Sequence, residues 1–154
     1  MSGPSITTPI FVIEPGDVTV RLSLAEALSS VEAIDLVDRP VGMWDGTGIR
    51  LQLAAESDLG PITVSSIGPL EEGWLKDTLA DFIRRVGPER YALGDVDLDT
   101  PDLAELVVAM EAQEREWRAS RFSLLKAVIR RLRSIKRQVS EIRQNRWPAP
   151  SAPE

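Results

Sequence analysis

The most regular hydrophobic pattern of the chain lies near its C-terminal end. Large apolar residues recur there at alternating intervals of three and four positions: Leu125, Val128, Leu132, Ile135, Val139 and Ile142. This is the spacing of the a and d positions of a heptad repeat, and it predicts a helix with one apolar face. Neither Gly nor Pro occurs between Asp102 and Trp147, so no helix breaker interrupts the segment.

Shorter patterns upstream predict a mixed domain. Strands are predicted where β-branched and alternating apolar residues occur, at 10–13, 18–22, 41–44, 49–53 and 62–64. Pro15-Gly16 and Asp45-Gly46-Thr47-Gly48 are turn signals between neighbouring strands. The order of strands and helices predicts an α+β fold. It would contain a small, mainly antiparallel sheet with two or three helices, followed by a long basic amphipathic C-terminal helix.

Two helices are predicted within this domain. The first follows Ser23, which forms a capping box with Glu26, and its apolar face extends to Ile34. The second follows Gly68-Pro69 and ends before Gly87, because glycine favours the residue position just past a helix.

A third helix is predicted to begin at Pro101, with Thr100 as its N-cap. Apolar residues in its first turns predict that it packs on the domain: Leu103, Leu106, Val107 and Met110. Glu114 and Arg121 then interrupt the apolar pattern before it resumes near Leu124.

The interruption suggests where the domain ends. We expect an acidic α+β domain at 10–112 and a basic amphipathic helix at 113–147. The polar ends of the chain, 1–9 and 148–154, contain several prolines and are expected to be disordered tails.

Charge is divided unevenly between these two parts. The 154 residues carry a formal net charge of −6. Residues 1–114 hold 7 basic and 21 acidic residues, whereas residues 115–146 hold 11 basic and 2 acidic ones. An acidic domain joined to a basic helix indicates that the helix attracts a partner of opposite charge.

The composition removes several kinds of chemistry. The chain contains no His and no Cys, so the commonest general base, the commonest zinc ligand and any thiolate nucleophile are missing. Asp45-Gly46-Thr47-Gly48 lacks the Lys and the helix start of a phosphate-binding loop. Paired acids such as Glu71-Glu72 are expected by chance in a chain with 24 acidic residues. We therefore expect no catalytic residues, no cofactor and no enzyme activity.

One acidic loop invites comparison with a calcium site. Asp95, Asp97 and Asp99 have the spacing that opens an EF-hand loop. That loop needs Gly at its sixth position and a bidentate Glu at its twelfth, where this chain has Thr100 and Leu106. The expected metal content is therefore none.

The basic helix is the candidate partner-binding element. Its candidate residues are the six of the heptad pattern together with Trp117, Arg130, Arg131, Arg133, Lys136 and Arg137. The first interpretation is pairing with a helix of a protein partner or of a second copy. The alternative is a peripheral adaptor whose helix contacts an anionic membrane or nucleic acid. Nucleic acid is favoured less, because the acidic domain would oppose its approach.

The four tryptophans fall into two groups. Trp44 and Trp74 lie within predicted elements of the domain and are expected in or near its core. Trp117 and Trp147 bracket the basic segment, where they would serve as contacts in an oligomer or at a membrane interface. No run approaches the roughly 20 apolar residues that span a bilayer, and residues 1–9 do not resemble a signal peptide. A cytoplasmic location is therefore expected.

Three stretches carry a resemblance to known proteins. They are Phe11-Val12-Ile13-Glu14, the segment 24–36 with Val31-Glu32-Ala33-Ile34-Asp35 at its centre, and Trp44-Asp45-Gly46-Thr47-Gly48. Together they resemble a group of uncharacterised small actinobacterial proteins over about residues 10–86. The shape of that group is similar to the immunity proteins of bacterial toxin systems. The resemblance implies a non-enzymatic, immunity-like or accessory bacterial protein, and it assigns no functional residue.

Overall fold

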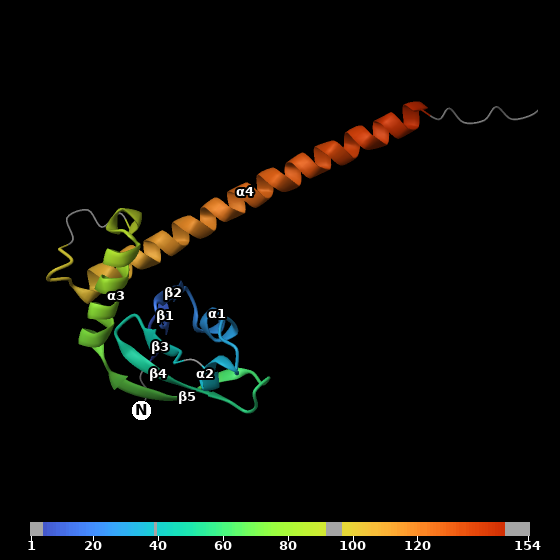
Figure 1. Cartoon of the computed structure of the whole chain (residues 1–154). Coiled ribbons are helices and arrows are strands. Elements are labelled where there is room, and N and C mark those ends of the chain that lie inside the picture. Colours follow the sequence, from blue (N-terminus) through green and yellow to red (C-terminus); the bar gives the residue numbers. More distant parts are fainter. Residues whose placement is uncertain (1–4, 39, 92–96, 147–154) are drawn as a thin grey trace, which may run out of the picture. The chain divides into compact units, whose positions relative to one another are not determined.

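The computed structural model describes the backbone of residues 5–38, 40–91 and 97–146, and side chains within these ranges as far as Arg133. It divides into two compact units, Met1–Arg115 and Glu116–Glu154. Figure 1 shows the order of the elements along the chain. The strands are β1 (Ile10–Glu14), β2 (Asp17–Arg21), β3 (Gly42–Asp45), β4 (Ile49–Ala55) and β5 (Ile62–Leu70). The helices are α1 (Leu24–Ser29), α2 (Asp35–Asp38), α3 (Glu72–Val86), the 3-10 helix η1 (Pro88–Tyr91) and α4 (Leu103–Arg146).

The strands form one five-stranded sheet in the order β2-β1-β3-β4-β5, and every neighbouring pair is antiparallel. The predicted α+β class, with its antiparallel sheet and long C-terminal helix, is therefore confirmed. Phe11 on β1 lies opposite Val20 on β2 and Trp44 on β3. Because paired residues point to the same face of a sheet, these three side chains contribute to one core.

Each face of the sheet carries its own apolar core. On one face, Phe11 and its cross-strand partners pack against α3 and the start of α4, through Leu75, Leu79, Ile83, Leu106 and Met110 among others. On the other face, Ile10 and Val12 pack against the α1 segment and the chain that follows it. The predicted packing of Leu103, Leu106, Val107 and Met110 on the domain is confirmed, since all four are buried.

A buried carboxylate organises the hairpin between β3 and β4. Asp45 is fully buried, and its Oδ1 accepts hydrogen bonds from Thr47 N at 2.9 Å, Thr47 Oγ1 at 2.7 Å and Ile49 N at 3.0 Å. Its Oδ2 accepts a hydrogen bond from Thr7 N at 3.0 Å. The predicted turn is correct, and Asp45 joins it to the segment that precedes β1.

That last contact changes the interpretation of the N-terminal segment. The tail predicted at 1–9 is instead fixed at its end, because Gly46 N donates to Thr7 O at 3.0 Å and Pro9 is buried. Thr7 takes part in these bonds through its backbone N–H and C=O, which every residue but proline has, so the pattern of side chains gave no sign of them. Residues 1–4, Trp147 and the predicted tail at 148–154 lie outside the described residues.

The first predicted helix was wrong in its length. It begins as expected, with Ser23 Oγ accepting from Glu26 N at 3.2 Å, but α1 ends at Ser29. The hydroxyls of Ser29 and Ser30 donate to the carbonyls of Glu26 and Ala27, at 3.0 and 2.8 Å. Serine hydroxyls compete in this way with helical N–H groups for the same acceptors.

A non-helical segment follows this break. Val31 and Ala33 are both buried in it, while Ile34 is 47% exposed. Burial of residues two positions apart suits a non-helical segment and not one face of a helix. The chain then forms the short helix α2 as a separate element.

Two other boundaries differ from the prediction. Helix α4 begins at Leu103 and not at Pro101, and the Oδ1 of Asp102 accepts from Ala104 N at 2.7 Å in the manner of an N-cap. Strand β5 extends to Leu70 and includes Gly68-Pro69, whereas the sequence predicted a strand only at 62–64. Because β5 is an edge strand, a proline is tolerated there.

Candidate functional site

The most exposed set of large apolar side chains in the second unit lies on helix α4. These side chains are between 40% and 67% exposed: Trp117, Phe122, Leu124, Leu125, Val128, Ile129 and Leu132. We call this set the α4 apolar face. Four of its members were candidates from the sequence. Phe122, Leu124 and Ile129 were missed because they fall outside the strict a and d positions.

The spacing of these residues places most of them along one side of the helix. Leu125, Val128 and Leu132 are three and four residues apart, and Leu124 follows Trp117 by seven. With about 3.6 residues per turn, such positions lie above one another on the helix surface. Phe122 and Ile129, also seven apart, widen the stripe on one edge. The stripe is therefore broader than a two-position seam and typical of an amphipathic helix.

One cation within this stripe contacts a ring of the apolar face. Arg121 lies four residues after Trp117 and four before Leu125. Its guanidinium carbon lies 4.5 Å from the centroid of the Trp117 ring. This distance allows a cation–π interaction, so Arg121 covers part of the indole while its charge stays in water. Arg121, which interrupts the apolar pattern in the sequence, therefore contacts a member of the α4 apolar face.

The rest of this helix segment is basic. Residues 116–133 contain six basic residues and one acidic residue. Arg130, Arg131 and Arg133, all candidate residues, are exposed. The other candidates lie farther along α4, and their side chains are outside the described residues: Ile135, Lys136, Arg137, Val139 and Ile142.

The first unit contains an aromatic cluster near the start of α3. The rings of Trp44 and Trp74 stack with their centroids 4.4 Å apart. Trp44 is 5% exposed and lies in the core, and Trp74, which stacks on it, is 47% exposed at the edge of the core. The indole N–H of Trp44 donates to Glu71 Oε2 at 2.9 Å. Arg50 lies over the Trp44 ring at 5.4 Å and is 3.8 Å from Glu71 Oε1.

An open pocket of about 680 Å³ adjoins this cluster, with Ile13, Glu14 and Val41 in its wall. The charged groups nearest the rings, Arg50 and Glu71, contact each other. The cluster therefore ties β3 and β4 to the first turn of α3. Gly42 is required beside it, since a Cβ there would lie 2.2 Å from the Trp44 ring.

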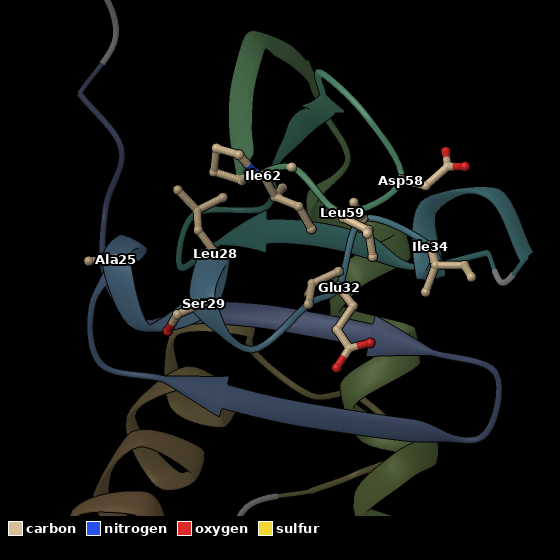
Figure 2. A pocket seen from close by; sticks show the side chains of 12 residues that line it. Ala25, Leu28, Ser29, Glu32, Ile34, Asp58, Leu59 and Ile62 are labelled. Carbon is tan, nitrogen blue, oxygen red and sulfur yellow. The ribbon is translucent and has the colours of Figure 1, made fainter.

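A second pocket of about 660 Å³ lies between residues 25–34, from α1 to the residue before α2, and residues 58–62, from the β4–β5 loop to the first residue of β5. Figure 2 shows the side chains that line it, with Leu59 between Ile62 and Ile34 in this view. Leu59 is 98% exposed and Ile34 is 47% exposed. We call this second pocket the acidic pocket. The sequence did not reveal this pocket, because it depends on the break after α1 and on the position of the β4–β5 loop.

Carboxylates surround this apolar surface. Glu32 and Asp58 are in its lining, and in Figure 2 their carboxylates point away from the apolar groups. Asp38 at the end of α2 and Glu56 just after β4 are also exposed. The sequence has no Lys or Arg in residues 22–38 or 51–75, so both walls of the pocket come from segments that carry only negative charge.

The loop compared with a calcium site has internal bonds. Asp97 Oδ1 accepts from Asp99 N at 2.9 Å, and its Oδ2 accepts from Thr100 Oγ1 at 2.9 Å. These hydrogen bonds favour the ionised form and lower the pKa of Asp97. Asp95 lies outside the described residues, and within those residues no group of three or more acids is arranged to hold a metal ion. The expected absence of calcium binding stays a prediction.

Comparisons with protein-family models, curated proteins and solved structures found no match to this chain. None of the helices in the described part of the chain combines the length and apolar composition of a membrane-spanning helix.

Proposed function

We propose that this protein is a non-enzymatic protein-interaction module whose α4 apolar face pairs with a protein. The observation that carries the proposal is the half-exposure of seven large apolar side chains over residues 117–132. Burying apolar surface is favourable by about 25 cal/mol per Å², so these side chains gain stability when a partner covers them. An immunity-like or accessory role in a bacterium, which the resemblance over residues 10–86 implies, agrees with a function by binding.

Two features favour a protein over an anionic surface. The regular spacing of Leu125, Val128 and Leu132 is that of side chains that interlock with another helix. The preceding 114 residues carry 21 acidic and 7 basic residues, and this excess of negative charge opposes approach to lipid headgroups or nucleic acid. A protein partner with acidic residues around an apolar surface would satisfy both the face and its flanking cations.

Salt dependence of binding tests the proposal. Full-length protein would be titrated with vesicles that contain phosphatidylserine and, separately, with duplex DNA, at low and at physiological salt. Self-association would be followed in the same buffers by light scattering. We expect little binding to either polyanion at physiological salt, because exposed charges are screened over about 8 Å there.

Two variants separate the contribution of the apolar side chains to binding from the contribution of the positive charges. Leu125→Lys removes part of the α4 apolar face while adding positive charge, and Lys126→Gln removes one charge while leaving the face intact. We expect Leu125→Lys to abolish protein pairing and Lys126→Gln to change it little. Tight binding to vesicles or DNA that Leu125→Lys preserves and Lys126→Gln weakens would replace the proposal with the anionic-surface alternative.

A further inference from the structure

The first unit offers an apolar surface that has no cover within the described structure. Leu59, at the mouth of the acidic pocket, is 98% exposed, and Val37 on the neighbouring helix α2 is 76% exposed. Leu28 and Ile62 line the same pocket and are less exposed. The volume of about 660 Å³ falls within the range of ligand-binding clefts.

The charge of this surface selects its partner. Glu32 and Asp58 line the pocket, and the segments that form it carry acidic residues without any Lys or Arg. A segment that fits must therefore be apolar where it enters and basic around that point. Opposite potentials across an interface speed association and exclude partners of the wrong charge.

This chain contains a segment of that description. The α4 apolar face exposes Leu125, Val128 and Leu132 at helical spacing, and residues 116–133 carry six basic residues and one acidic residue. An amphipathic helix that places such anchors in a groove is a common mode of peptide recognition. We infer that the acidic pocket receives the α4 apolar face of a second copy of this chain.

The inference rests on the proposed function and adds the recipient surface and the identity of the partner. The contact joins two different surfaces of the chain, the α4 apolar face and the acidic pocket. Such a contact closes when two copies exchange helices reciprocally, and otherwise it extends from copy to copy. A direct pairing of two α4 helices would instead bring two basic segments together, and neighbouring like charges disfavour that arrangement.

Single substitutions on each side of the contact test the inference in the full-length chain. Leu59→Lys places a cation in the acidic pocket against the basic helix and removes an apolar anchor. Because Leu59 is almost fully exposed, the domain should fold as before, which circular dichroism would verify. Leu70→Lys is the matched control, since Leu70 is 62% exposed on β5 and outside the pocket lining.

Sedimentation equilibrium would measure self-association of each variant. We expect Leu59→Lys to raise the dissociation constant at least about tenfold, as loss of a central interface residue does, and Leu70→Lys to leave it unchanged. Leu125→Lys should have the effect of Leu59→Lys. Mixing the Leu59→Lys and Leu125→Lys proteins should then restore a one-to-one pair, because the first supplies an intact helix and the second an intact pocket.

Other results would overturn the inference. If Leu59→Lys associates as the unchanged protein does while Leu125→Lys does not, the helix pairs elsewhere, and only the proposed function survives. If the mixture of the two variants stays monomeric, the two surfaces are not partners. A wild-type chain that is monomeric at about 1 mM, a concentration that would populate even a weak complex, would exclude a second copy as the occupant.

Discussion

At the scale of single residues, a buried carboxylate fixes the β3–β4 hairpin of the first unit. Asp45 accepts bonds from Thr7, Thr47 and Ile49, and thereby joins the start of the chain to the β3–β4 hairpin. The sequence predicted the turn, because Asp-Gly followed by Thr-Gly is a local signal. It did not predict the bond to Thr7, which joins residues 38 positions apart.

Replacing Asp45 with Ala should be strongly destabilising. The substitution leaves several buried or partly buried donors without an acceptor, and each hydrogen bond to a charged group contributes about 1.5–3 kcal/mol. We expect a loss of about 3 kcal/mol or more in the free energy of unfolding, measured by urea denaturation. Asp77→Ala, at an exposed position of α3, is the control and should change this free energy by less than about 0.5 kcal/mol. Equal effects of the two substitutions would refute the role given to Asp45.

Tyr91 offers a direct electrostatic readout, because it is the only tyrosine of the chain. Burial raises the pKa of its hydroxyl, the positive charge of Arg90 lowers the pKa, and the negative charge of Asp17 raises it. The folded state therefore favours the neutral phenol. This contribution to stability is complete below the unfolded pKa of about 10 and is lost as pH rises through the folded pKa.

Absorbance at the phenolate band should show this shift. The titration midpoint of the folded protein should lie above that of the protein in denaturant. Asp17→Asn should lower the folded midpoint, because it removes a negative charge that disfavours the phenolate. Identical midpoints in the folded and denatured protein would contradict the burial of this side chain.

At the scale of elements, local signals predicted starts and ends where the stabilising group is close in sequence. Ser23 caps α1 as expected, and Gly87 follows α3 with φ +105. The break after Ser29 was missed, because it depends on the burial of Val31 and Ala33 in the core as well as on the serine hydroxyls. Periodicity alone cannot distinguish a helical stripe from an apolar segment that tertiary packing extends.

Two glycines in different elements should respond to the same substitution with opposite signs. Gly42→Ala on β3 would place a Cβ 2.2 Å from the Trp44 ring, so the Trp44–Trp74 stack must shift. We expect a loss of about 1–3 kcal/mol in stability and a changed near-ultraviolet circular dichroism spectrum. Gly73→Ala on α3 meets no atom within 4 Å and should stabilise the protein by up to about 1 kcal/mol. Destabilisation by Gly73→Ala together with a neutral Gly42→Ala would contradict this packing.

At the scale of the whole molecule, the uneven charge of the chain places opposite charges on the two surfaces that we propose to pair. The sequence indicated an acidic domain and a basic helix, and it identified Leu125, Val128 and Leu132 as candidates for contact. Their exposure on α4 is established, and their binding role is our proposal. The acidic pocket could not be predicted, because it requires the β4–β5 loop and the chain after α1 to meet across the sheet. The sequence shows which segments are acidic, whereas the tertiary fold determines which of them lie together on one surface.

Hydrogen exchange of the full-length protein, followed by mass spectrometry as a function of protein concentration, tests the central claim most directly. If the α4 apolar face is covered by another copy, amide exchange over residues 117–133 should slow as concentration rises, because pairing suppresses local opening of the helix. Residues 25–34 and 58–62 should gain protection over the same concentration range. The Leu125→Lys protein should show neither change. Exchange over residues 117–133 that is equally fast at every concentration, in the wild type as in the variant, would contradict the account.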